Sequence, residues 1–412
     1  NKIELNKNKP QNIVIGAPAH GGDNDYNDVG LVDNTSDAVL QLSLKFEQMQ
    51  SLLYAKMVEK VGDRRYWEQW AKDIAEIAER QIERITHLVV EDKKHKKAFE
   101  CFLKGLCKNI NPSVTEAEAI EMLSQHIITQ PVFEALFENY SFVKNNAISQ
   151  SMQQMLELLE NENTEQENET LQKFYDSVKM RASEIDNAEA KQKIIIELYD
   201  KFFKAAFPKM AERLGIVYTP IEVVDFIIHS GSDALQKEFG RTLSDENIHI
   251  LDPFTGTGTF ITRLLQTGLI SPKTLERKYK KEIHANEIVL LAYYIASVNI
   301  ENVYHEIKNE TEGEYTSFDG ICLTDTFQLG ETKDGKELFS EMFPQNSKRV
   351  QEQQKAPLRV IIGNPPYSIG QRSANDNAQN QKYENLDKRV METYVAESAA
   401  GLSKSLYDAY IK

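Results

Sequence analysis

The stretch His249-Ile-Leu-Asp-Pro-Phe-Thr-Gly-Thr-Gly-Thr-Phe260 decides the fold of the second half of this chain. Its apolar start predicts a short buried strand, its two glycines predict a tight turn, and the residues from Ile261 to Thr267 predict a helix. Such a turn brings the backbone close to a ligand and directs the free amides of the helix start toward it. We therefore expect a ligand site here, although a turn that needs glycine only for its dihedral angles has the same pattern.

Further short segments with β-branched residues follow this strand and alternate with helical segments. They lie at 282–286, at the run that ends with residues 321–323, and at 358–362. Strands that alternate with helices are typical of a parallel, doubly wound sheet. The sequence thus predicts a Rossmann-like α/β core over residues 206–412.

The first half of the chain has helical periodicity. Apolar residues recur at steps of three to five through the segment 66–88, and the other helices are predicted over 95–108, 115–128, 131–159, 168–182 and 186–213. One short β-like run occurs at Ile13–Ile15, within an irregular stretch. We predict a mostly α-helical domain over residues 1–205 with a short irregular or β segment at its start.

The composition excludes several classes of protein. The 412 residues contain only three cysteines, too few for a disulfide framework, and no apolar run approaches the length that crosses a bilayer. We expect a cytoplasmic protein, and the polar start without Met indicates a piece of a longer polypeptide. The net charge of -15 is unfavourable for binding the phosphates of a nucleic acid, so either a basic binding surface lies elsewhere or the target is not a nucleic acid.

Polar residues at the ends of the predicted strands suit a nucleoside cofactor. Glu287 closes the second strand, where a carboxylate can accept from ribose hydroxyls, and Asp325 follows the third, where it can accept from an adenine amine. Glu287 could equally open a helix and meet its dipole. Upstream, Thr219 is a plausible cap and Pro220 a first-turn residue of a helix, a pattern that a well-capped helix alone would also give.

The fourth strand ends in Gly363-Asn-Pro-Pro-Tyr367, which suits one particular reaction. Two prolines fix the backbone and remove amide donors, so the segment presents carbonyl oxygens, although such dipeptides also mark ordinary turns. The amine of adenine is a poor nucleophile because its lone pair is delocalised. If the Asn364 side-chain oxygen and the Pro365 carbonyl each accept an amine hydrogen, the lone pair is freed for attack on a sulfonium methyl, with Tyr367 stacked on the flipped base.

In this order of motifs, residues 215–412 resemble the methyltransferases that modify adenine N6 in DNA. The resemblance implies S-adenosylmethionine as cofactor, no metal, and catalysis by Asn364, Pro365, Pro366 and Tyr367. It implies cofactor binding by a longer set of residues: Tyr218, Thr219, Pro220, Asp252, Pro253, Phe254, Thr255, Gly256, Gly258, Thr259, Phe260, Asn286, Glu287, Asp325, Thr326, Phe327 and Asn364.

The helical segment ahead is similar to the coupler of large single-chain restriction-modification enzymes of the Type ISP or IIG kind. That resemblance implies a helicase-like ATPase and a nuclease in the same polypeptide, and binding of double-stranded DNA through a recognition domain absent from this chain. It also implies that the methyltransferase domain is C-terminally truncated after the fourth strand. The alternatives are a methyltransferase acting on RNA or on a protein glutamine amide, and a cofactor-binding or coupler fragment without turnover.

Overall fold

The computed structural model describes residues 64–136, 142–159, 176, 219–308, 315–331, 341–365 and 383–397. The predicted strand at Ile13–Ile15, the predicted helix over 186–213 and the predicted domain boundary after residue 205 lie outside these ranges. Of the predicted helix over 168–182 only Asp176 is described, in helical conformation. Residues 63–412 form one compact unit.

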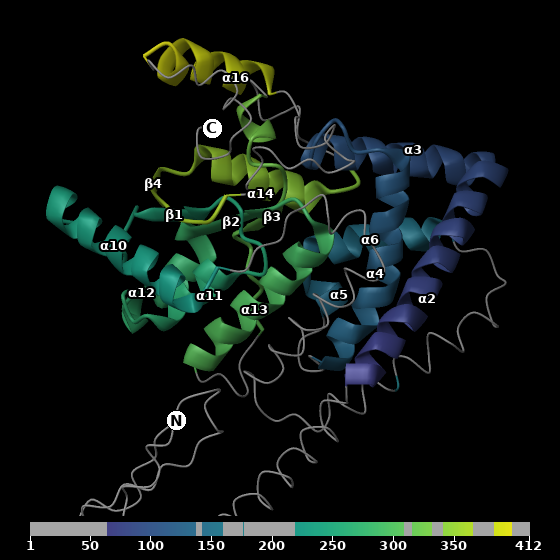
Figure 1. Ribbon diagram of the computed structural model, residues 1–412, viewed down its shortest axis with the longest axis horizontal. Coiled ribbons are helices and arrows are strands. Elements are labelled where there is room, and N and C mark those ends of the chain that lie inside the picture. The colour runs from purple at the N-terminus through teal and green to yellow at the C-terminus, as the bar shows by residue number, and fades with distance from the viewer. Residues whose placement is uncertain are drawn as a thin grey trace, which may run out of the picture. The chain divides into compact units, whose positions relative to one another are not determined.

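The helices of the first half pack against one another (Figure 1). They are α2 (Arg64–Glu91), α3 (Lys93–Asn109), α4 (Glu116–Leu136), α5 (Phe142–Asn145) and α6 (Ala147–Leu159). Asp92 caps α3, because its side chain accepts from the Lys94 amide at 2.6 Å. Phe102, Leu123 and Met152 are fully buried between these helices. The helices predicted over 66–88 and 95–108 are confirmed, and no helix in the described ranges is long and apolar enough to cross a membrane.

The helix α4 corrects the predicted ranges 115–128 and 131–159. It continues through Pro131 to Leu136, although an interior proline removes one hydrogen bond at a cost of about 3 kcal/mol. Beyond the proline, Phe133 is buried with its ring edge on Tyr294, and this packing offsets the cost. The second predicted helix is divided at Asn146, whose side chain accepts from the amides that begin α6.

The second half contains a parallel sheet of four strands in the order β3-β2-β1-β4. The strands are β1 (His249–Asp252), β2 (Ile283–Glu287), β3 (Ile321–Leu323) and β4 (Leu358–Ile361), within one residue of their predicted bounds. In the register, Leu251 pairs with His284 of β2 on one side and with Ile361 of β4 on the other. The predicted parallel α/β core is therefore confirmed.

Helices cover both faces of the sheet (Figure 1). On one face lie α11 (Thr259–Gln266) and α13 (Leu290–Lys308), and on the other lies α14 (Pro344–Lys355). The helices α10 (Ile221–Phe239) and α12 (Pro272–Arg277) flank α11, η2 (Lys278–Glu282) leads into β2, η3 (Gln328–Gly330) follows β3, and α16 (Glu384–Val390) with η4 (Met391–Val395) comes last.

The helix α13 packs against the sheet and also against helix α4 of the first half. It is buried along most of its length. Its Tyr294 hydroxyl lies 3.0 Å from His126 Nδ1 of α4, and Ser297 accepts from Asn146 at 3.4 Å. Because these contacts are buried, the two halves share one continuous core within residues 63–412.

Candidate active site

The carboxyl edge of the sheet brings together four of the residues that the sequence predicts for binding and catalysis. From β1 the chain adds β2 and β3 on one side and β4 on the other, so the strand order reverses beside β1. Open α/β sheets bind ligands in the crevice at this switch point. Asp252 ends β1, Glu287 ends β2, Asp325 follows β3, and Asn364 follows β4, so all four lie along this edge.

The turn between β1 and α11 depends on two glycines in the left-handed conformation. Gly256 has a φ of 57° and Gly258 a φ of 86°. Among the described residues, no atom other than those of its chain neighbours lies within 4 Å of the place that a Cβ would take on Gly256. A Cβ on Gly258 would lie 3.2 Å from Ala296 of α13. No side chain caps the start of α11 at Thr259. Gly258 therefore serves packing, and Gly256 leaves an open approach to the backbone.

Asp252 carries an unsatisfied oxygen into this turn. Its side chain is fully buried, Oδ1 accepts from the Phe254 amide at 3.2 Å, and Oδ2 has no hydrogen-bond partner among the described residues. Burial, and next to it the neighbouring Glu287 carboxyl, raise the pKa of Asp252 to about 7. A buried carboxylate oxygen without a donor is a feature that a bound cation or donor group would satisfy.

Glu287 holds the glycine turn against β2. Its Oε2 accepts from the Gly256 amide at 2.7 Å, and Oε1 accepts from the amides of Ile288 and Val289 at 2.9 and 2.8 Å. Burial raises the pKa of Glu287 to about 7, against the effect of these three amide donors. Glu287, which the sequence predicts as a ribose ligand, therefore also orders the glycine turn.

Gly363 brings the end of β4 onto the Asp252 carboxyl. A Cβ at this position would lie 2.8 Å from Asp252 Oδ1 and 3.3 Å from Pro253 Cδ, closer than side chains tolerate. Only glycine allows this approach without a shift. Asn364, the first residue of its motif, thereby lies beside the glycine turn.

Hydrogen bonds among predicted cofactor residues tie three strand ends together. Asn286 donates to the Thr326 hydroxyl at 3.1 Å, and that hydroxyl donates to the Pro253 carbonyl at 2.7 Å. The Phe254 and Phe327 rings lie with their centroids 5.3 Å apart. These contacts thus hold the ends of β1, β2 and β3 together at the carboxyl edge of the sheet.

Two more predicted cofactor residues, Thr255 and Phe260, lie in the same turn and at the start of α11. The Thr255 amide donates to the Asn286 carbonyl at 2.9 Å, and its hydroxyl donates to the Asp252 carbonyl at 3.2 Å. The Phe260 side chain is buried.

Asp325 is surrounded by donors. Its Oδ2 accepts from the Asn111 side chain at 2.6 Å and from the Tyr383 hydroxyl at 2.7 Å. Its Oδ1 accepts from the amides of Phe327 and Gln328 at 2.9 and 3.4 Å. Asn111 belongs to the turn between α3 and α4, so a residue of the helical half reaches the predicted nucleoside end of the site.

Asn364 is held by the segment that precedes α10. Its Nδ2 donates to the Thr219 hydroxyl at 3.1 Å. The prediction of Thr219 as a cap is wrong, because α10 begins at Ile221 with Pro220 as its N-cap and without a side-chain cap. The Thr219 hydroxyl orients the Asn364 carboxamide instead. Three predicted site residues, Tyr218, Pro366 and Tyr367, lie outside the described residues.

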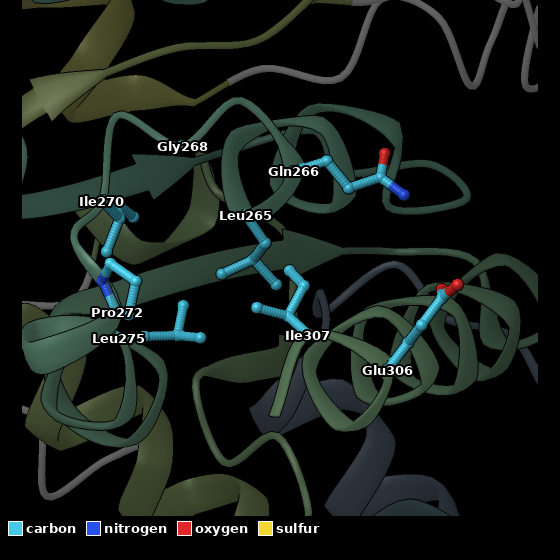
Figure 2. Close-up of a pocket in the computed structure, with 8 residues that line it drawn as sticks. All are labelled: Leu265, Gln266, Gly268, Ile270, Pro272, Leu275, Glu306 and Ile307. Atoms are coloured by element: carbon cyan, nitrogen blue, oxygen red, sulfur yellow. The ribbon is translucent and has the colours of Figure 1, made fainter. Parts of the chain in front are cut away.

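A separate pocket of about 350 Å³ opens at the far end of α11 (Figure 2). Figure 2 shows apolar side chains turned toward one another there, with Gln266 and Glu306 extending away from them. The lining residues are Leu265, Gln266, Gly268, Ile270, Pro272, Leu275, Glu306 and Ile307. None of them is a predicted site residue, and the length of α11, about 12 Å, separates the pocket from the glycine turn.

Sequence reasoning missed three residues of the site, namely Asn111, Gly363 and Tyr383. Gly363 directly precedes the Asn-Pro-Pro-Tyr motif, so its position beside that motif was a usable signal. Asn111 lies 214 residues from its partner Asp325, and nothing in the local pattern indicates that contact.

Comparison with family models divides the chain into two matches. Residues 66–190 match the coupler domain of Type ISP restriction-modification enzymes, and residues 190–400 match the N-6 DNA methylase family, which is slightly more than half of the chain. A comparison with curated proteins finds no match. Asn111 falls in the first match, and the carboxyl edge of the sheet falls in the second.

Solved structures similar to the chain include three complexes. A nuclease-deletion mutant of the Type ISP restriction-modification enzyme LlaGI with a DNA substrate mimic is 48% identical, with a TM-score of 0.78 over 89% of this chain. The ATP-dependent Type ISP restriction-modification enzyme LlaBIII bound to DNA is 49% identical, with a TM-score of 0.79 over 90% of this chain. The protein chain in the DrdV–DNA complex is 34% identical, with a TM-score of 0.71 over 84% of this chain. The chain covers 30%, 25% and 34% of these chains, respectively.

Proposed function

We propose that this chain, which belongs to the N-6 DNA methylase family, holds the cofactor and the target adenine in an enzyme that methylates adenine N6 in DNA as part of a restriction-modification system. The observation that carries the proposal is the placement of Asn364 at the switch point. There, Gly363 lies against the Asp252 carboxyl and Thr219 orients the Asn364 carboxamide. A donor-binding carboxamide thus adjoins a turn suited to a charged ligand.

The residues of the turn fit S-adenosylmethionine, which supplies a methyl group activated on a positively charged sulfur. The Asp252 Oδ2 atom lacks a donor and suits the ammonium group of the amino-acid part. Glu287 has one acceptor position left on Oε2 beside its three amide donors, enough for one ribose hydroxyl rather than two. Gly256 leaves room for close approach to the backbone. The metal-free chemistry of methyl transfer needs no other group here.

We assign the handling of the target amine to Asn364 and Pro365. The carboxamide orientation that directs Nδ2 to Thr219 directs Oδ1 to the opposite side, where it accepts one amine hydrogen. The Pro365 carbonyl accepts the other. Two acceptors on the amine favour a pyramidal nitrogen with a localised lone pair, and a fixed position replaces a chance encounter.

The remaining roles come from the motif. Tyr367 stacks on the adenine after it leaves the duplex, and Pro366 keeps the segment rigid. Tyr218 joins Thr219 and Pro220 on the cofactor side. Roles in cofactor contact are likewise assigned to Pro253, Phe254, Thr255, Gly258, Thr259, Phe260, Asn286, Asp325, Thr326 and Phe327.

The partners in this proposal are double-stranded DNA and motor and nuclease modules of the same polypeptide. The matched coupler domain and the small share of each Type ISP chain that these residues cover support it. The net charge of -15 indicates that the basic DNA-gripping surface belongs to a recognition domain outside these residues. Three free thiols, at Cys101, Cys107 and Cys322, suit a reducing cytoplasm.

The test is methyl transfer from S-adenosylmethionine labelled in its methyl group to DNA by the full-length protein, followed by identification of the modified nucleoside. We expect label on adenine N6. The Asn364→Ala variant should transfer about 100-fold more slowly. Label on cytosine N4, RNA or protein glutamine would contradict the proposal, as would cofactor binding without any transfer by the wild-type protein.

A further inference from the structure

The end of α3 and the turn that follows it are linked to the end of β3 at two points, one direct and one through Asn346. Asn111 donates directly to Asp325 at 2.6 Å. Asn109, two residues earlier, accepts from Asn346 at 3.0 Å, and Asn346 also bonds both backbone groups of Leu323 at 2.9 and 3.0 Å. All of these side chains are buried. The helical half therefore bonds directly to the Asp325 carboxylate and, through Asn346, to the last residue of β3.

Asn111 is itself fixed before it meets the carboxylate. Its Oδ1 accepts from the Ser113 amide at 2.9 Å, which leaves Nδ2 directed at Asp325. The side chain is 3% exposed, so no water layer separates the two groups. A carboxylate held by a rigid donor has one orientation, and an orientation is what a directional contact to a ligand amine requires.

We propose that Asn111 is a positioning residue for nucleobase recognition, through which the helical half sets the orientation of Asp325 toward the 6-amino group of the cofactor's adenine. The inference rests on the proposed function, because it takes the ligand to be an adenine nucleoside. It adds a residue from the coupler match to a site that otherwise lies in the methylase match.

Tyr383 takes the place of the amine in this structure. Its hydroxyl donates to Asp325 Oδ2 at 2.7 Å, and its ring lies 5.5 Å from that of Phe327. An aromatic ring with a donor at its edge has the same two features as adenine with its amine. Oδ2 already accepts two donors, so the amine binds there when the Tyr383 hydroxyl leaves and Asn111 stays.

The test measures binding of two nucleosides to the chain by calorimetry. S-adenosylhomocysteine carries the 6-amino group, and S-inosylhomocysteine has an oxygen in its place. The wild-type chain should prefer the adenosine form by at least about tenfold, the worth of one well-directed hydrogen bond to a charged group. Asn111→Ala should reduce this preference to about twofold and leave the affinity for the inosine form unchanged.

Ser297→Ala is the matched control, because Ser297 accepts a buried hydrogen bond from Asn146 between the same two halves without touching Asp325. It should keep the full preference. If Asn111→Ala keeps the preference as well, or if both ligands weaken equally, Asn111 is merely structural and the inference is overturned. A wild-type chain that binds neither nucleoside would instead contradict the proposed function, and the inference would fall with it.

Tyr383→Phe supplies an effect of opposite sign. It removes the competing hydroxyl and keeps the ring on Phe327, so S-adenosylhomocysteine should bind about threefold more tightly. Weaker binding would show that the hydroxyl is not a competitor and would overturn the exchange at Asp325.

A measurement on the wild-type chain covers the case in which the Asn111 variant fails to fold. Amide hydrogen exchange over residues 105–118 should slow more with saturating S-adenosylhomocysteine than with saturating S-inosylhomocysteine. Equal exchange with both ligands would overturn the inference.

Discussion

The two ends of the carboxyl edge are built in opposite ways. At the β1 and β4 end, Asp252 keeps one buried oxygen without a partner among the described residues. At the β3 end, the Asp325 carboxylate accepts from two side chains and two backbone amides. The first arrangement raises the free energy of the unliganded chain and favours ligand binding. The second stabilises the fold and lets distant segments act on the site.

The largest effect on stability is expected from removing the carboxylate at the satisfied end. Asp325→Ala leaves the buried donors of Asn111 and Tyr383 without their acceptor, and each costs about 1–3 kcal/mol. We expect the free energy of unfolding to fall by about 4 kcal/mol, as measured by urea denaturation. The exposed Asp233 of α10 is the control, and Asp233→Ala should change the stability by less than about 0.5 kcal/mol. Similar losses in both variants would contradict the role of Asp325 as a junction.

A methyl group added at the other end should damage the site as well as the fold. Gly363→Ala places its Cβ 2.8 Å from the Asp252 carboxyl, so the two strand ends must separate. We expect a loss of about 2 kcal/mol in stability and at least about tenfold in cofactor affinity. Gly330→Ala is the matched control at the β3 end, because nothing lies within 4 Å of its Cβ position. Unchanged cofactor affinity in Gly363→Ala would argue against a site at the switch point.

The pH dependence of cofactor affinity tests the role of the buried carboxyls Asp252 and Glu287 without any mutation. Burial raises the pKa of both Asp252 and Glu287 to about 7, so in the unliganded chain they hold protons that a cationic ligand displaces. The affinity for S-adenosylmethionine should rise about tenfold from pH 6 to pH 8, by linkage to one carboxyl. Calorimetry in buffers of different ionisation enthalpy should detect proton release. Proton uptake, or no dependence on pH, would contradict this assignment.

The same pKa shifts predict an effect of opposite sign on the stability of the unliganded fold. Unfolded Asp and Glu release their protons near pH 4 and the native groups near pH 7, so their contribution to stability falls as the pH rises between these values. Asp252→Asn removes one buried charge, so the stability of the variant relative to the wild-type chain should be about 2–3 kcal/mol greater at pH 8 than at pH 5, where the native carboxyl is protonated. The same substitution should weaken cofactor binding. Thermal melts of both chains at both pH values measure the difference in stability, and a relative stability no greater at pH 8 than at pH 5 would contradict it.

The sequence predicted the edge of the sheet because parallel strands all end on the same side. Glycines after β1, a carboxylate after β2 and after β3, and Asn364 after β4 must then meet, whatever the helices between them do. The strands lie within one residue of their predicted bounds, because short segments with apolar or β-branched residues alternate with longer helical segments in the sequence.

Contacts between distant side chains left no such pattern. A buried asparagine that bonds a carboxylate 214 residues away has no periodicity, so no pattern in the sequence predicted the contact of Asn111. Pro131 was misleading for a related reason. The local rule predicts a break, and only the tertiary packing of Phe133 on Tyr294 shows why the helix continues.

The contacts of Asn109 and Asn111, at the end of α3 and in the turn after it, also bear on how the protein can be divided into fragments. The two family matches meet at residue 190, yet the Asn109 and Asn111 contacts cross from one match to the other. A fragment cut at residue 190 would expose Asp325 to water and leave the inner face of α13 bare. The unit that folds is thus larger than either family match, and an isolated methylase segment should need the helical half supplied in trans to become ordered.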